Sequence, residues 1–266
     1  MPKLIPPRRD RRALSYNSSY FRHKAARLSL RFIHLGGSSK MRATQMSGRE
    51  IPLPPTEYMK LVCGPEHDPK TFTAAGEGLV GLLEEHGMLG SHVRLLDIGC
   101  GCGRVARYLM DKPLGSYVGF DRHAGMVEWC NREITPYAPG FKFLYLKVKS
   151  PYTLMDGDAG AVEVADFRFP FDDRSFDAVL LSSVFTHMPL HEISHYLGEV
   201  HRVLDHKGRA LFSVFFVDGD REPYDNGLDF LLNKNQFTDM ISKSPMSYRF
   251  LYEGGSHYYH IATRND

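Results

Sequence analysis

A carboxylate followed by three regularly spaced glycines offers the clearest chemistry in this sequence, in the run Asp97-Ile98-Gly99-Cys100-Gly101-Cys102-Gly103. An apolar run over 93–98 leads into it, which predicts a strand that turns tightly into a helix and lets a nucleotide-like ligand approach the backbone. A dinucleotide fingerprint would require Gly or Ala where Arg104 stands. Asp97 would repel a pyrophosphate but could accept hydrogen bonds from an amino group. The loop therefore predicts a ligand without phosphate.

Residues 93–217 resemble the class I methyltransferases that use S-adenosylmethionine (SAM), the broad group that includes the ubiquinone-biosynthesis type. The glycine loop is similar to the first motif of that family, and Asp121 matches its ribose-binding acid, although it could instead cap a helix. The runs over 169–179 and 199–209 resemble two further segments of the family. The resemblance implies SAM as the cofactor, with contacts from Asp97, Gly99, Cys100, Gly101, Gly103, Asp121, Arg122, Asp166, Phe167 and Ser182.

One position departs from the family pattern. The family usually has an acid just after the third strand, which contacts the adenine amino group, and here that place holds Lys147. An insertion follows through about Glu163. Asp166, with Phe167 beside it, is the predicted replacement, and Phe167 could also be an ordinary core residue.

His187 is the predicted general base. It follows an apolar run over 177–183, and ligands of open α/β sheets sit beyond the carboxyl ends of the strands. A hydroxyl or protonated amine needs a base before it can accept a methyl group, and histidine titrates in the useful range. The alternative is a histidine that caps the following helix. His191 and His195 continue the spacing, but Pro189 interrupts it, so no metal site is predicted.

The acceptor is expected to be a small molecule, lipid or glycan, methylated at oxygen. The chain lacks the Asn/Asp-Pro-Pro loop of adenine-N6 enzymes and the Pro-Cys nucleophile of cytosine-C5 enzymes, and a paired-glutamate loop of protein-arginine enzymes is not apparent. Two alternatives stay open, an RNA-directed methyltransferase and a SAM-binding partner subunit without catalysis. The glycine spacing disfavours a nicotinamide oxidoreductase.

The elements that must position these residues alternate between strands and helices. Strands are predicted over 93–98, 117–120, 141–148, 177–183 and 210–217, and a closing hairpin over 248–252 and 258–263. Helices are predicted near 71–89, 105–110, 126–134, 193–204 and 237–241, whereas the prolines of 51–70 indicate an irregular connector. The pattern predicts a doubly wound, mostly parallel, seven-stranded α/β sheet of Rossmann-like type with a C-terminal antiparallel hairpin.

The charge distribution divides the chain. Residues 1–50 hold 12 Lys and Arg against two acids, a net charge of +10, and the remainder carries −8. This arm could be a solvated tail, a helix that binds a membrane surface or an acidic partner, or an organelle transit peptide. We therefore expect a basic arm over 1–50, a connector and helix over 51–92, and a methyltransferase domain over 93–266. The four cysteines are expected to be reduced and the protein cytoplasmic, or peripheral to a membrane or organelle-targeted through the arm, with nucleic acid an unlikely partner.

Overall fold

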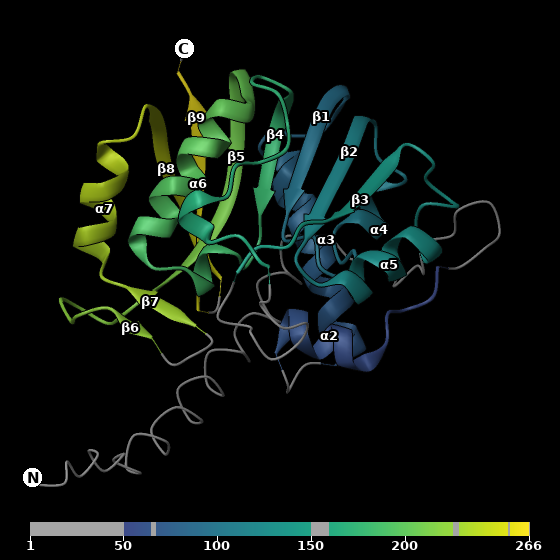
Figure 1. Ribbon diagram of the computed structural model, residues 1–266, viewed down its shortest axis with the longest axis horizontal. Helices are drawn as coiled ribbons and strands as arrows, with labels where there is room; N and C mark the ends of the chain where they lie inside the picture. Colours follow the sequence, from purple (N-terminus) through teal and green to yellow (C-terminus); the bar gives the residue numbers. More distant parts are fainter. Residues whose placement is uncertain (1–50, 65–67, 150–159, 226–228, 255, 266) are drawn as a thin grey trace, which may run out of the picture.

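One mixed β-sheet forms the centre of the protein in the computed structural model (Figure 1). The structure describes residues 51–64, 68–149, 160–225, 229–254 and 256–265. The basic arm predicted over 1–50 lies outside the described residues, as does the middle of the insertion predicted after Lys147. Among the helices that the structure describes, none is long and apolar enough to cross a bilayer.

Seven strands of the sheet have the predicted arrangement. Five are parallel, in the order β3 (Phe141–Tyr145), β2 (Leu114–Asp121), β1 (Gly90–Ile98), β4 (Phe176–Leu181) and β5 (Leu204–Phe216). The C-terminal hairpin then adds β9 (His257–Arg264), antiparallel to β5, and β8 (Met246–Gly254) beside it. A short ribbon, β6 (Tyr224–Asp225) and β7 (Phe230–Leu232), extends the end of β5 and was not predicted. The predicted fold class is confirmed.

Helices cover both faces of the sheet because successive strand residues point to opposite sides. Leu95 packs with the first face, whose helices are α3 (Pro69–Glu85), α4 (Ala106–Leu109) and α5 (Ala124–Glu133). Its neighbour Leu96 packs with the second face, whose helices are α6 (Leu190–Val203) and α7 (Lys234–Ser242). Each face therefore has its own hydrophobic core.

The connector predicted over 51–70 is partly wrong, because it contains helix α2 (Thr56–Cys63). Pro55 supplies the carbonyl that accepts hydrogen bonds from the backbone N–H groups of Tyr58 and Met59. A proline just before a helix lacks an N–H that would be unpaired there in any case, so it begins the helix rather than preventing it. Met59 is buried in the same core as Leu95. This segment packs onto the domain that begins at β1.

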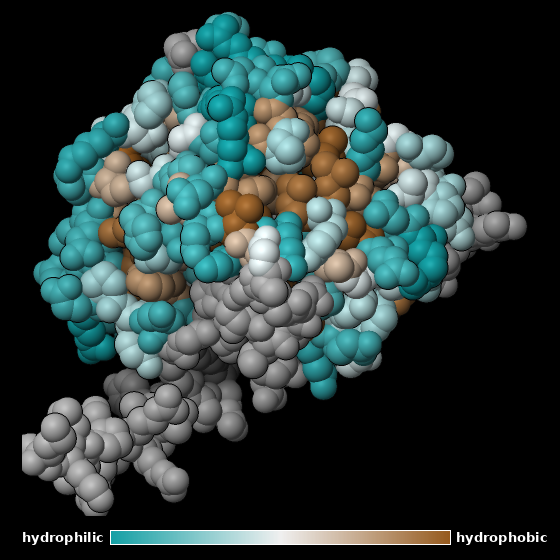
Figure 2. Space-filling model, in the orientation of Figure 1, coloured by the Kyte–Doolittle hydropathy of each residue, from teal (hydrophilic) through white to brown (hydrophobic). Residues whose placement is uncertain are grey.

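Aromatic side chains cover the second face between β3 and α6. Phe167 and Phe169 contact Phe120, with ring centroids 6.2 and 5.5 Å apart, and Phe169 also meets Tyr196 at 5.1 Å. Half-buried apolar side chains surround this cluster, and Figure 2 shows apolar surface gathered in the middle of this face. The segment before β4 is therefore held by its phenylalanines.

The parallel register aligns the carboxyl ends of the central strands. Asp97 of β1 lies opposite Gly119 of β2 and Leu180 of β4. The residues that follow these strands consequently meet at one edge of the sheet, where open α/β sheets bind their ligands. The predicted site residues lie largely at this edge.

Candidate functional site

A pocket opens at the carboxyl ends of β1, β2 and β4. Its wall includes eight of the eleven residues predicted for the site, namely Asp97, Gly99, Cys100, Gly101, Asp121, Arg122, Ser182 and His187. Apolar side chains from several elements complete the lining, among them Leu61, Val62, Phe120, Leu146, Val148 and Val164. The pocket joins a polar glycine loop to an apolar wall, which suits a ligand with one charged and one planar end.

All three glycines of the loop adopt left-handed backbone conformations, with φ of 71°, 53° and 73° at Gly99, Gly101 and Gly103. A Cβ at Gly99 would lie 2.6 Å from Val184, and a Cβ at Gly103 would lie 2.3 Å from Ile134. Other residue types would be strained here. Gly103 does not line the pocket, so its role is to let the loop pack onto α5.

Asp121 fixes the glycine loop. One carboxylate oxygen accepts a hydrogen bond of 2.8 Å from the backbone N–H of Gly101, and the other accepts one of 2.8 Å from the N–H of His123. The N–H groups of Gly99 and Cys100 donate to the carbonyl of Phe120. Burial raises the pKa of Asp121, which these two hydrogen bonds oppose. The carboxylate thus holds the loop while it also borders the pocket.

Asp97 lies at the other side of the loop and is only 2% exposed. The hydroxyl of Tyr117 donates a 2.8 Å hydrogen bond to its carboxylate. Burial raises the pKa of Asp97 to about 7, since water is withheld from its charged form. A cationic partner in the pocket would favour the ionised carboxylate.

Arg104, which follows the glycines, is a further residue of the site that was not predicted from the sequence. Its guanidinium contacts the Cys63 thiol at 3.4 Å and donates to the Ser182 hydroxyl at 3.1 Å. It also lines the pocket. The arginine thereby links α2 to the end of β4 across the mouth of the loop.

His187 ends the short helix η3 (Phe185–His187), which follows β4 after a three-residue turn. Its Nδ1 lies 3.5 Å from a carboxylate oxygen of Asp229, and its side chain is 14% exposed. Ser183, two residues after β4, has a left-handed φ of 60°, and its hydroxyl lies 3.1 Å from Nε2 of His257. Strained backbone of this kind is frequent at functional sites. Ser183 and His187 both border the pocket.

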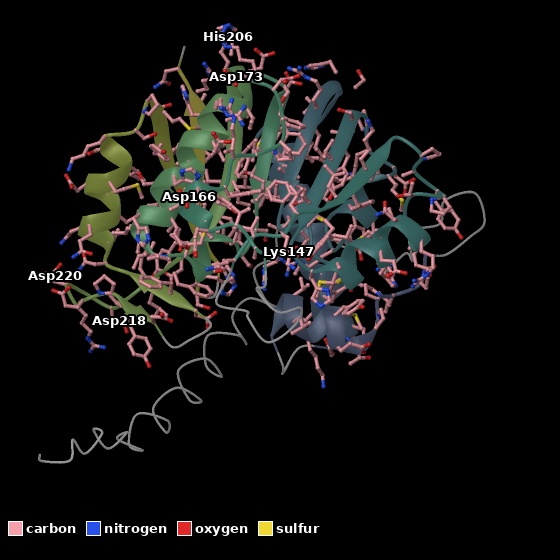
Figure 3. The ribbon with its side chains drawn as sticks, viewed as in Figure 1. Lys147, Asp166, Asp173, His206, Asp218 and Asp220 are labelled. Carbon is pink, nitrogen blue, oxygen red and sulfur yellow. The ribbon has the colours of Figure 1, made fainter. Side chains whose placement is uncertain are left out.

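Asp166 and Phe167 are not brought into the pocket wall. Asp166 ends the short helix η2 (Val164–Asp166), is exposed, and lies apart from Lys147 (Figure 3). Phe167 is buried in the aromatic cluster, and its carbonyl accepts a hydrogen bond from His195. The structure gives these two residues no contact with the pocket. Within the described residues, no group of His, Cys, Asp or Glu has an arrangement that could hold a metal ion.

Glu192 and Tyr196 on α6 also line the pocket, and the sequence analysis did not assign them. Burial raises the pKa of Glu192. Their spacing of four residues places both on one face of a helix, which was a usable signal once the helix was predicted. Asp229 offered no such signal, because it contacts His187 only through the fold.

Comparison with known proteins agrees with this geometry. A family model described as "Methyltransferase domain" matches residues 96–212. The structure is similar to the [4+2]-cyclase SpnF (17% identity, TM-score 0.53, covering 72% of this chain and 81% of that one). It is also similar to a SAM-dependent methyltransferase from Aquifex aeolicus (16% identity, TM-score 0.51, covering 80% and 98%).

A third similar structure is the 1,6-didemethyltoxoflavin-N1-methyltransferase of Burkholderia thailandensis (18% identity, TM-score 0.51, covering 82% and 94%). At these identities the structural likeness shows the fold, and the acceptor must be argued from the site. The matched family model spans β1 to β5, the strands that build the pocket. Residues 96–212 therefore form a methyltransferase domain, and the chain has the fold of the SAM-dependent methyltransferases.

Proposed function

We propose that this protein transfers a methyl group from SAM to an oxygen atom of a small-molecule, lipid or glycan acceptor. One observation carries the proposal: Asp97 and Asp121, on either side of the glycine loop, border the same pocket. SAM has an ammonium group at one end and vicinal ribose hydroxyls in its middle. Carboxylates form their stronger hydrogen bonds with such donors.

The residues present fit the cofactor along its length. Asp97 would hold the amino group of the methionine part, and Asp121 would accept hydrogen bonds from the ribose. The apolar residues Leu146, Val148 and Val164 line a part of the pocket that suits a purine ring. Glu192, half-buried in the same wall, replaces Asp166 as our candidate acceptor for the adenine amino group.

His187 would remove the proton from the acceptor. When bound, SAM supplies an electrophilic methyl group, and the displaced electron pair stays on sulfur. The acceptor oxygen forms the new O–C bond, and its proton passes to His187, so that atoms and charge balance. A general base of this kind contributes about 10²- to 10⁴-fold to the rate.

The first experiment is titration calorimetry of the full chain with SAM and with S-adenosylhomocysteine (SAH), followed by transfer of a labelled methyl group into small-molecule, lipid, glycan and RNA fractions. We expect both ligands to bind and label to enter a non-nucleic-acid fraction. His187→Gln should retain SAH binding and lose transfer. The matched control is His206→Gln, an exposed histidine at the opposite edge of the sheet (Figure 3).

Three outcomes would contradict the proposal. Absence of SAH binding would remove the cofactor assignment. Binding without transfer to any fraction would instead favour a SAM-binding partner subunit. Labelling of the RNA fraction alone would show that the acceptor is RNA and not a small molecule, lipid or glycan. Near-normal transfer by His187→Gln would leave the methyltransferase standing and remove its proposed base.

A further inference from the structure

Asp229, a residue outside the family motifs, contacts the proposed base. Its carboxylate oxygen lies 3.5 Å from Nδ1 of His187, and the two side chains are 26% and 14% exposed. A carboxylate charge in such a partly buried position is weakly screened by solvent. The contact therefore has more effect on the histidine than a surface pair would have.

The fold brings the two residues together from distant parts of the chain. Asp229 immediately precedes β7, which pairs in parallel with the end of β5 through Phe215–Leu231 and Phe216–Leu232. The short helix η3, which carries His187, packs against both β5 and β7. Figure 1 shows β7 below α6, near the carboxyl end of β5. The ribbon that extends β5 thus brings a carboxylate to the proposed base.

We propose that Asp229 is a positioning residue that accepts a hydrogen bond from Nδ1–H of His187 and directs Nε2 toward the acceptor. This inference rests on the proposed function for its role in methyl transfer. The hydrogen bond holds the neutral ring in the tautomer whose Nε2 lone pair can take a proton. The carboxylate also stabilises the imidazolium that forms when the proton arrives. A partner that fixes the ring of a catalytic histidine is a recurrent arrangement in enzyme sites.

Other titratable and charged groups line or flank the pocket that His187 borders, and their effects must be separated from that of Asp229. They come from β1 and the glycine loop, from the end of β2 and the turn after it, from the segment after β3, from α6 and from the hairpin: Asp97, Cys100, Arg104, Asp121, Arg122, His123, Lys149, His191, Glu192, Tyr196 and His257. Asp225 and the Asp218–Asp220 stretch lie on the β6 side (Figure 3). All of these remain in place when Asp229 alone is changed to Asn, so a difference between the two proteins isolates Asp229.

The first test needs no acceptor. Histidine resonances of the full chain are followed by heteronuclear NMR from pH 5 to 9, and the His187 signals are identified by their absence in His187→Gln. In Asp229→Asn we expect the pKa of His187 to fall by about 1 pH unit, because a neighbouring negative charge is lost. We also expect the nitrogen shifts to move from Nδ1–H toward a mixture of tautomers. Asp225→Asn, an exposed carboxylate of β6, is the matched control.

The second test measures catalysis once an acceptor fraction is known. Asp229→Asn should keep its SAH affinity within about twofold, lower kcat by at least about tenfold, and move the acidic limb of the pH–rate profile to lower pH. Asp229→Glu should restore part of kcat. A merely structural role would change the melting temperature and SAH affinity without moving the pH profile.

The proposed function and the role of Asp229 can be refuted separately. Lack of SAH binding would overturn the proposed function while the NMR titration still reports on the pair. An unchanged pKa and tautomer of His187 in Asp229→Asn, or equal changes in Asp225→Asn, would overturn the inference. So would unchanged kcat and pH profile in a variant that binds SAH normally.

Discussion

Replacing Asp97 with Asn should make the free protein more stable at alkaline pH and remove much of its affinity for the cofactor. The carboxyl is 2% exposed, and burial raises its pKa to about 7. Asn has nearly the same shape, is neutral at every pH, and can still accept the hydrogen bond from the Tyr117 hydroxyl. The substitution therefore tests the charge rather than the packing.

The magnitude follows from the difference between the folded and unfolded pKa values. An aspartate in an unfolded chain titrates near pH 3.9, about 3 pH units below Asp97 in the folded protein. Because the folded state holds its proton more tightly, the stability contributed by this group is complete below about pH 4 and is lost as pH rises to about 7. One pKa unit corresponds to about 1.4 kcal/mol, so the free energy of unfolding of Asp97→Asn should be about 4 kcal/mol higher than that of the original protein at pH 8. The gap should nearly close at pH 4.

Urea unfolding of both proteins at pH 4, 6 and 8 measures this difference in the free energy of unfolding. Asp121 is present in both proteins, so the part of its titration that is independent of the Asp97 charge cancels in the comparison. Calorimetry with SAH in two buffers of different ionisation enthalpy supplies a second reading. At pH 6 binding should release about one proton from the original protein, since the ligand ammonium favours the ionised carboxylate. Parallel stability profiles, or no proton release at pH 6, would show that burial does not raise the pKa of Asp97 in this way.

Three further predictions follow from the site. In Asp121→Asn the side chain can accept only one of the two backbone hydrogen bonds that the carboxylate accepts. Calorimetry should show SAH binding weakened by about 2 kcal/mol, or about 30-fold. The control substitution Asp166→Asn should leave SAH binding unchanged. Gly103→Ala places a Cβ 2.3 Å from Ile134 at a residue with a left-handed φ. Urea unfolding should therefore show a free energy of unfolding lower by about 2–4 kcal/mol. A decrease of less than about 1 kcal/mol would contradict this close packing. Glu192→Ala should reduce the preference for SAH over its hypoxanthine analogue, and an unaltered preference would exclude the adenine contact.

The fold was predictable because its signals are local. Apolar runs such as 93–98 and 177–183 became β1 and β4, and the alternation of strands and helices implied the parallel sheet. The terminal hairpin also followed from its turn residues. Helix α2 was missed because the prolines around it indicated a loop, while Pro55 in fact begins the helix. A proline blocks the middle of a helix but not its first turn.

The site was predictable only where chemistry and chain position coincide. Asp97 and Asp121 each end a strand, so the topology alone brings them to one edge of the sheet. Asp166 was chosen by its nearness to a family segment, and the structure exposes it, since the adjacent Phe167 takes the inward position. Asp229 reaches His187 through the packing of β7, which no local pattern records. Contacts of this kind depend on the whole fold.

The double use of Asp121 has a consequence for recognition. A carboxylate has about four lone-pair sites, and the loop N–H groups occupy two of them, leaving acceptor capacity toward the pocket. The Asp121 carboxylate that would bind the ribose is thus the same group that fixes the glycine loop. The glycine loop is already ordered in the folded protein, so the loop would lose little additional conformational entropy when a nucleoside binds.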